Sequence, residues 1–121
     1  MIERNIKVDM KEGNKVVASF IISKHTVASN TRHSAKIQEI LDRKLPDAET
    51  NQLLACSALA CTLKDTDGNL VYPEASGAET IYNEMDADEY TFLCEAYIEV
   101  NPLSPSLKAK KKKYWVMARS C

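Results

Sequence analysis

The chain has 121 residues, of which 45% are hydrophobic and 27% charged, and its formal net charge at pH 7 is −1. This composition is typical of one soluble globular domain, and no apolar run is long enough to cross a membrane. The first residues contain an acid and lack the apolar core of a signal peptide, so we expect a cytoplasmic protein.

The charges are segregated along the chain. Residues 1–45 carry nine Lys/Arg and five Asp/Glu, residues 46–106 carry one and twelve, and residues 107–121 carry six and none. Blocks of opposite sign favour docking within the chain or head-to-tail self-association. A strongly acidic body, with basic residues that are not interleaved with aromatic ones, argues against a nucleic-acid binder.

The N-terminal residues predict a β-hairpin over 5–23. Ile6, Val8 and Met10 alternate with polar residues, Gly13 stands in the turn, and the second strand is rich in β-branched side chains. Two strands alone are marginally stable, so one face must pack on a helix or on another chain. The exposed edge is a natural site of self-association. The residues that we expect to take part in it are Val17, Ser19 and Ile21.

Two helices are predicted next, over 29–44 and 47–63. The first has Ser29, Asn30 or Thr31 as its cap and one apolar stripe, whereas the second is apolar on every side, which is typical of a buried helix. Asp47 can cap the second helix, and the short connection between the two predicts an αα-hairpin. The stripe of the first helix consists of Ala35, Ile37, Ile40, Leu41 and Leu45.

An Asp-Thr-Asp-Gly sequence follows at residues 65–68 and invites comparison with the calcium loop of an EF-hand. The first position of that loop would be Leu63, which has no ligating oxygen, and Pro73 stands where the exiting helix should begin. We therefore expect a Gly/Asn turn without a metal ion, and then a short extended segment over 70–72.

The last elements are a short helix over 79–85 and a longer one over 86–100, which Asp86 can cap. Phe92 falls outside the apolar stripe of the longer helix and among acidic residues that include Glu95 and Glu99. Two interpretations stay open: another part of the domain covers this aromatic ring, or the ring binds a partner protein.

The sequence contains no recognisable catalytic or metal-binding cluster. Its cysteines have no CxxC pair, and its two histidines stand in polar contexts that favour the protein surface. An enzyme with a nucleophilic Cys61 or Cys94 lacks an evident base, so we expect no catalytic residue, cofactor or metal. The residues concerned are Cys56, Cys61, Cys94 and Cys121, with His25 and His33.

These elements together predict an α+β fold that is mainly α. The folded domain spans residues 1–103, with a hairpin, three main helices and one short helix. Residues 104–121 form a flexible basic tail, because two prolines stop the last helix and a lysine run is usually solvated.

The order of these segments resembles that of the tail assembly chaperones of long-tailed bacteriophages. A hairpin is followed by a helical pair that ends in A-C-T-L-K-D-T-D-G-N-L-V-Y, and an acidic stretch then leads to E-Y-T-F-L-C-E-A-Y-I-E-V-N-P-L. The resemblance covers residues 1–103. It implies that many copies coat the tape measure protein before the tail tube polymerises, and that they help to recruit the major tail protein.

The tail adds to this resemblance. Members of the family are often made in two lengths, the longer one after ribosomes slip on a repetitive codon run. An unbroken run of adenines can encode Lys110, Lys111, Lys112 and Lys113, so this chain resembles the short, unshifted form. A plain basic tail accounts for the same residues equally well.

The resemblance implies a protein that acts in the host cytoplasm, self-associates into oligomers or spirals, binds neither nucleic acid nor membrane, and is absent from the mature virion. We expect the partner surface on the outer side of the last helix, with Phe92, Glu95 and Glu99, and on the open side of the buried helix, with Leu59 and Leu63.

Two other readings stay open. The first is another small phage or host adaptor of acidic α+β type, which predicts a single protein product. The second is RNA or membrane binding through the lysine run of residues 108–113, which predicts a steep dependence on salt.

Overall fold

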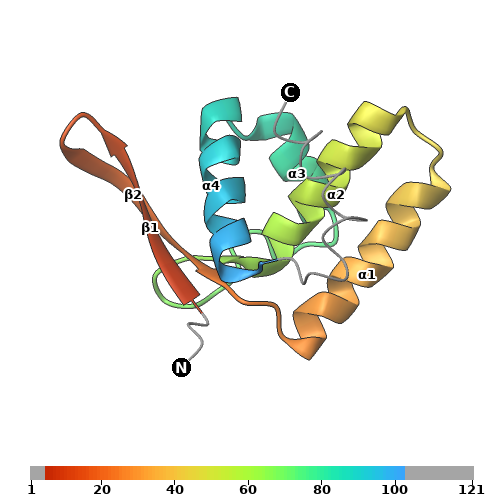
Figure 1. Ribbon diagram of the computed structural model, residues 1–121, viewed down its shortest axis with the longest axis horizontal. Coiled ribbons are helices and arrows are strands. Elements are labelled where there is room, and N and C mark those ends of the chain that lie inside the picture. Colours follow the sequence, from red (N-terminus) through yellow and green to blue (C-terminus); the bar gives the residue numbers. More distant parts are fainter. Residues whose placement is uncertain (1–4, 103–121) are drawn as a thin grey trace.

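A computed structural model of the protein describes residues 5–102, and they form the predicted α+β fold that is mainly α. The elements are β1 (Asn5–Glu12), β2 (Lys15–Ser23), α1 (Val27–Asp42), α2 (Asp47–Thr62), β3 (Leu63–Lys64), α3 (Gly77–Glu84) and α4 (Ala87–Val100). The hairpin projects to one side, α4 lies beside it, and α2 runs between α4 and α1 (Figure 1). The predicted basic tail over 104–121 lies outside the described residues.

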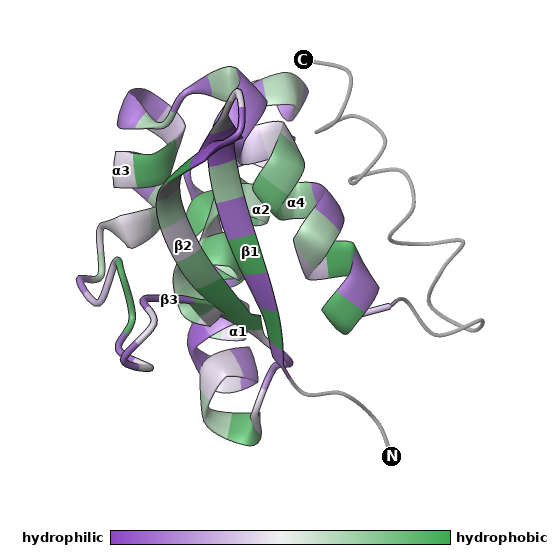
Figure 2. Ribbon diagram, turned by 90° about the vertical axis from the view of Figure 1, so that its left-hand side faces the viewer, coloured by the Kyte–Doolittle hydropathy of each residue, from purple (hydrophilic) through white to green (hydrophobic). Residues whose placement is uncertain are grey.

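The predicted hairpin is confirmed. β1 and β2 pair in antiparallel register with Ile6 opposite Ile22 and Val8 opposite Phe20. Gly13 takes a positive φ of 65° in the turn, a conformation that a residue without a Cβ adopts at little cost. Apolar and polar residues alternate along β1 (Figure 2), so one face of the pair packs on the helices.

A third strand extends this sheet in the order β1-β2-β3, and the sequence did not indicate it. Leu63 and Lys64 pair with Ile22 and Ile21 as soon as α2 ends. The loop that follows turns back at Gly68, with a φ of 90°, and the carboxylate of Asp65 accepts hydrogen bonds from two backbone N–H groups of this loop, at 2.9 and 3.0 Å. The Asp-Thr-Asp-Gly sequence thus stabilises a tight turn.

The helix that was predicted to be buried, α2, is covered by other elements beyond its first turn. It packs against α1, α3, α4 and β2, and eleven of its sixteen residues are buried, including Ala58 and Leu59 at 0% exposure. A helix with apolar side chains all round needs such an environment, because any open side would expose them to water.

The caps of the first two helices differ from the prediction. Thr26 caps α1, because its hydroxyl accepts from Ser29 N at 3.1 Å while Ser29 Oγ accepts from Thr26 N at 2.9 Å. This reciprocal pair starts the helix two residues earlier than predicted. α2 has Pro46 at its N-cap position and no side-chain cap, so Asp47 lies in the first turn and does not cap it.

The last two helices follow the prediction closely. Asp86 caps α4 as expected, accepting from Asp88 N and Glu89 N at 3.1 and 3.4 Å. α3 begins at Gly77, two residues early. A Cβ there would lie 3.0 Å from Tyr72 and 3.2 Å from Ala60, so a glycine allows α3 to approach α2 closely.

The predicted stripe of α1 is only partly buried. Ile40 is fully buried and Ile37 half-buried, but Leu41 is 45% exposed and Ala35 is also exposed. The apolar contact between α1 and α2 therefore involves fewer residues than predicted. Polar side chains form other contacts between the two helices, such as that of His33 with Ser57.

We predict that truncation of Leu59 strongly destabilises the protein, because it leaves a cavity beside a helix that is packed on every side. Leu59→Ala should lower the free energy of unfolding by about 3 kcal/mol. Leu41→Ala removes the same atoms from an exposed site and should change it by less than about 0.5 kcal/mol. Urea unfolding followed by circular dichroism measures both. Equal effects would contradict this account of the core.

Candidate functional site

A groove lies between β1 and α4. Phe92, Glu95, Ala96 and Glu99 have the i, i+3, i+4, i+7 spacing of one helical face, and this face lies beside β1. The groove has a volume of about 670 Å³. Its lining residues are Ile6, Lys7, Val8, Asp9, Phe92, Glu95, Ala96, Ile98 and Glu99.

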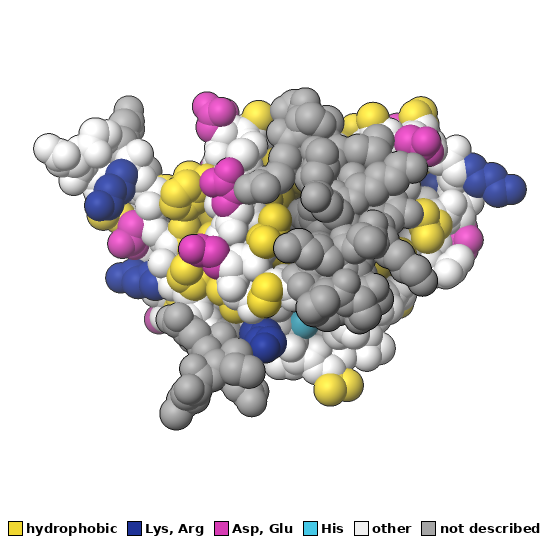
Figure 3. All heavy atoms as spheres, in the orientation of Figure 1, with side chains coloured by type: hydrophobic (Ala, Val, Ile, Leu, Met, Phe, Trp, Pro, Cys, Tyr) yellow, Lys and Arg dark blue, Asp and Glu magenta, His cyan; other side chains and the backbone are white. Residues whose placement is uncertain are grey.

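The β1–α4 groove has an apolar floor and an acidic rim. Val8 and Ala96 are buried at its base, and the half-buried Ile6 and Ile98 pack against the core beside them. In the space-filling view, hydrophobic side chains gather along the boundary between the hairpin and α4, and acidic side chains follow α4 (Figure 3). Among residues 5–102, three carboxylates and one lysine line the groove, and together they carry a net negative charge.

Phe92 stands on the rim of the groove with 43% of its surface exposed. The described residues leave this ring only partly covered, and partner binding by Phe92 stays a prediction. A partly exposed aromatic ring beside a concave apolar surface is typical of residues that dominate binding energy. Glu95 and Glu99 lie with it, as the sequence predicted.

The open side that was expected for α2 does not exist, so part of the predicted partner surface is wrong. Leu59 and Leu63 are both 0% exposed. Leu59 is enclosed by the helices that surround α2, and Leu63 has already left the helix to enter β3. Neither side chain can reach a partner while the domain is folded.

The predicted self-association edge is partly occupied. β3 pairs with β2 at Ile21, and the Ser19 hydroxyl donates a 2.6 Å hydrogen bond to Asp9 across the hairpin. Addition of a strand at Ile21 is therefore excluded. Val17 is the extra residue of a bulge in the register between β1 and β2. From Lys15 to Phe20, the side of β2 facing away from β1 pairs with no strand of the described residues.

The prediction that both histidines lie on the surface is wrong. Their rings are half-buried and stacked, with centroids 5.6 Å apart. His25 Nε2 lies 2.8 Å from the Tyr97 hydroxyl, and His33 Nδ1 lies 2.9 Å from Ser57 Oγ. These contacts join the start of α1 to α2 and α4. The histidines satisfy polar groups between helices, a role that a helical pattern does not reveal.

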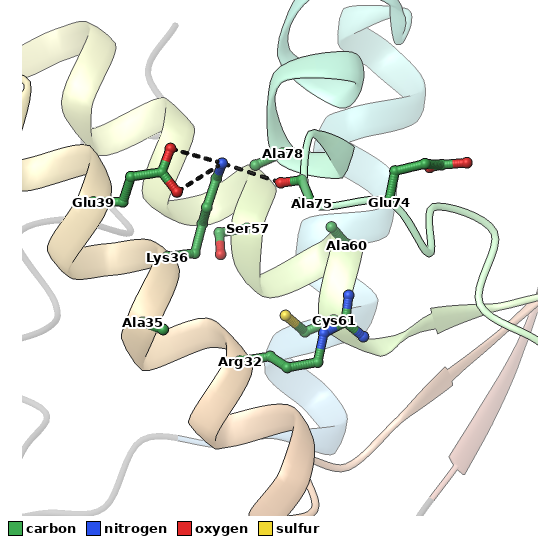
Figure 4. A pocket seen from close by; sticks show the side chains of 10 residues that line it. All are labelled: Arg32, Ala35, Lys36, Glu39, Ser57, Ala60, Cys61, Glu74, Ala75 and Ala78. Atoms are coloured by element: carbon green, nitrogen blue, oxygen red, sulfur yellow. Dashed lines mark hydrogen bonds and ion pairs between the residues drawn. The ribbon is translucent and has the colours of Figure 1, made fainter.

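A second hollow, of about 260 Å³, lies between α1, α2 and the segment before α3 (Figure 4). Its walls include Ala60, Ala78 and Cys61, and Lys36 crosses its edge. Lys36 Nζ lies 2.9 Å from Glu79 Oε2 and donates to the Ala75 carbonyl at 3.1 Å, so this lysine already has partners.

Ion pairs hold α1 to α3 at the edge of this hollow. Glu79 pairs with both Lys36 and Arg43, and Arg43 also pairs with Glu39 at 2.6 Å. Burial raises the pKa of Glu79, but hydrogen bonds from the lysine and the arginine lower it more, to about 2. These ion pairs therefore stabilise the contact between α1 and α3 at a place where α1 has polar side chains.

The buried thiols are poor candidates for a nucleophile. Burial raises the pKa of Cys56 to about 12 and also raises that of Cys61, which disfavours the reactive thiolate in both. Cys94 is buried as well. Within residues 5–102 no group of three or more His, Cys, Asp or Glu side chains is arranged to hold a metal ion.

Comparisons with protein-family models, with curated proteins and with solved structures find no match to this chain. In the part of the chain that the structure describes, no helix combines the length and apolar character needed to cross a bilayer.

We predict an acid-sensitive contribution from Glu79. Its folded-state pKa, about 2, lies below its ordinary value of 4.5, so the stabilisation is complete above pH 4.5 and is lost as the pH falls toward 2. Glu79→Gln should cost about 1 kcal/mol at pH 7, after screening by solvent, and almost nothing at pH 2. Urea unfolding at several pH values measures the difference.

The matched control is Glu74→Gln, which removes an exposed carboxylate from the adjoining loop. Glu74→Gln should change the free energy of unfolding only slightly at every pH. A loss of stability on Glu79→Gln that does not change between pH 7 and pH 2 would show that the charge of Glu79 is not what stabilises the contact between α1 and α3.

Proposed function

We propose that this protein is a tail assembly chaperone of a long-tailed bacteriophage. It binds and coats the tape measure protein in the host cytoplasm, helps to recruit the major tail protein, and leaves before the virion is mature. The observation that carries the proposal is the β1–α4 groove, where the exposed Phe92 ring stands above an apolar floor and between carboxylates. The order of segments in the sequence supports the same function.

The groove suits an amphipathic helix of the partner. A helix that lies along α4 can insert an apolar side chain beside Phe92 and place lysine or arginine near Glu95 and Glu99. A long tape measure protein exposes many such segments before assembly. Weak binding to each of them is sufficient, because many adaptor copies act together on one chain.

Self-association strengthens such coating. β1 is an edge strand, since β2 is its only strand neighbour in the described sheet. Contacts that repeat without closing into a ring would place successive copies along a spiral, which is the shape needed to wrap a rod. The alternative function is that of another small phage or host adaptor, which would use the same groove for a different partner.

We predict that Phe92→Ala weakens binding of the tape measure protein from the same phage by about thirtyfold, the loss expected of a dominant interface residue. Because Phe92 is 43% exposed, the fold should remain intact. Binding is measured by co-expression with the tape measure protein, followed by affinity capture and calorimetry on a fragment of it.

Tyr82→Ala is the matched control, since Tyr82 on α3 is a 40% exposed aromatic that does not line the groove. It should bind as the unsubstituted protein does. If Phe92→Ala and Tyr82→Ala bind equally well, the groove is not the binding site. If the unsubstituted protein does not bind the tape measure protein at all, the adaptor alternative is favoured.

We also predict a minor, longer product from the same messenger RNA. Its origin would be ribosomal slippage at the codons of Lys110, Lys111, Lys112 and Lys113, so these codons should form an adenine run with an open overlapping frame behind it. Expression of this region between two tags measures the second product. Mixed AAG codons and a single product would remove the frameshift from the proposal.

A further inference from the structure

We propose that the outer edge of β1 binds an extended segment of a partner protein, which adds to the sheet as an antiparallel strand and lies in the β1–α4 groove. Only the identity of the partner rests on the proposed function. An extended segment along β1 is a second form of ligand for this groove, beside a helical segment along α4, and one groove holds one of the two at a time.

β1 is the edge strand on the side of the sheet that faces the groove. The strand order is β1-β2-β3, and in the view of Figure 2 β1 lies between β2 and α4. Alternate residues of an antiparallel strand direct their backbone N–H and C=O groups away from the neighbouring strand. Within residues 5–102, no hydrogen bond joins these outward groups of β1 to another strand, a loop or a side chain. Such an unpaired row is what an incoming strand binds.

The lining of the groove indicates that this edge is accessible. Four consecutive residues of β1, Ile6 to Asp9, line it. Successive side chains of a strand point to opposite faces, so both sets line one groove only where the groove runs along the edge of the strand. A strand added at the usual spacing of about 4.8 Å from β1 therefore lies in the groove, with α4 on its other side.

The side of the added strand that faces α4 meets apolar surface. Val8 and Ala96 are buried at the base of the groove, and the ring of Phe92 on its rim is 43% exposed. Every second residue of an extended segment points to this side. Apolar residues at these alternate positions can cover the base and the ring, which removes apolar area from water on both chains.

Lys7 and Asp9 determine which charges the other side of the added strand should carry. Both alternate with Val8 and so lie on the opposite face of β1. Lys7 forms no ion pair within residues 5–102. Asp9 accepts a 2.6 Å hydrogen bond from Ser19, and a carboxylate can accept more than one. Side chains directly opposite each other have Cβ atoms about 5 Å apart, so an acid opposite Lys7 and a base opposite Asp9 are favoured.

An antiparallel direction fits the sheet, because β1 with β2 and β2 with β3 are both antiparallel pairs. Antiparallel ladders are also slightly more stable per residue than parallel ones. In this direction the matching segment is Val-Lys-Val-Glu-Val-Thr, with its lysine opposite Asp9 and its glutamate opposite Lys7. The ligand is thus an extended peptide in which apolar residues alternate with a base and then an acid.

The experiment adds the synthetic peptide acetyl-Val-Lys-Val-Glu-Val-Thr-amide to the full-length protein and follows amide hydrogen exchange by NMR. In the free protein, alternate amides of β1 should exchange rapidly, because they lie on the unpaired side of the strand. Peptide at millimolar concentration should slow the exchange of these amides several-fold. The amides of β1 that face β2 should change little.

Two N-methylated peptides separate strand addition from simple contact of side chains. Methyl groups on the nitrogens of alternate residues remove the hydrogen-bond donors from one edge of the peptide only. The peptide methylated on the edge that faces β1 should not bind, whereas the peptide methylated on the other edge should bind as the parent peptide does. Phe92→Ala should weaken binding several-fold, and Tyr82→Ala, outside the groove, should not.

Charge exchange tests the register. A peptide with its lysine and glutamate exchanged has the same composition but places like charges opposite Lys7 and Asp9, so it should bind several-fold more weakly. The double substitution Lys7→Glu with Asp9→Lys should reverse this preference. Circular dichroism checks that each variant is folded.

Three outcomes would overturn the proposal. The first is that peptide at millimolar concentration leaves the exchange of the β1 amides unchanged. The second is equal binding of the two methylated peptides. The third is protection of the β1 amides that rises with protein concentration in the absence of peptide, since this would assign the edge to a second copy of the chain.

This experiment needs no tape measure protein, so the two proposals can fail separately. If the peptide adds to β1 but the tape measure protein is not bound, the strand site is supported and the proposed function fails. If the tape measure protein binds through Phe92 while the β1 amides stay unprotected with it and with the peptide, the proposed function is supported and the strand site fails.

Discussion

The enclosure of α2 is the constraint on which the rest of the structure depends. Beyond its first turn, this sixteen-residue helix has apolar side chains on every side, and their burial requires α1, α3, α4 and β2 to pack around it. Two buried polar groups in its C-terminal half have hydrogen-bond partners. Thr62 donates to the Ala58 carbonyl at 2.8 Å, and Ser57 meets His33. Because α1, α3, α4 and β2 all pack on α2, each of them helps to hold α2 in the position on which the others pack.

The covering elements use different chemistry. α4 packs with buried Leu93, Cys94 and Tyr97, whereas α1 buries only Ile40 and holds its place largely through hydrogen bonds and ion pairs. Exposed ion pairs contribute modestly, are screened by salt and are lost when the carboxylates are protonated, whereas burial of apolar side chains involves no titrating group. The side of the molecule formed by α1 is thus more sensitive to solution conditions than the side formed by α4.

The β1–α4 groove results from the same packing of α4 between α2 and the hairpin. α4 must face α2 with one side and the hairpin with another, and its remaining side, with Phe92, meets solvent next to the edge strand. A surface of this kind exists because the sheet is short and ends at β1. The ring of Phe92 is 43% exposed there, between carboxylates of the same helix face.

The sequence by itself determined the elements that depend on local periodicity. Alternation placed the hairpin over residues 5–23, all-round apolar character made α2 buried, and Asp86 marked the start of α4. Helical spacing also grouped Phe92, Glu95 and Glu99. Only the tertiary structure decided what lies opposite them, because Ile6 on β1 is 86 residues away from Phe92 and no local pattern relates the two. The same limit explains the misplaced Leu59 and Leu63, since a helix apolar on all sides gives no sign of which side stays open, and the misplaced histidines, whose partners Ser57 and Tyr97 come from distant helices.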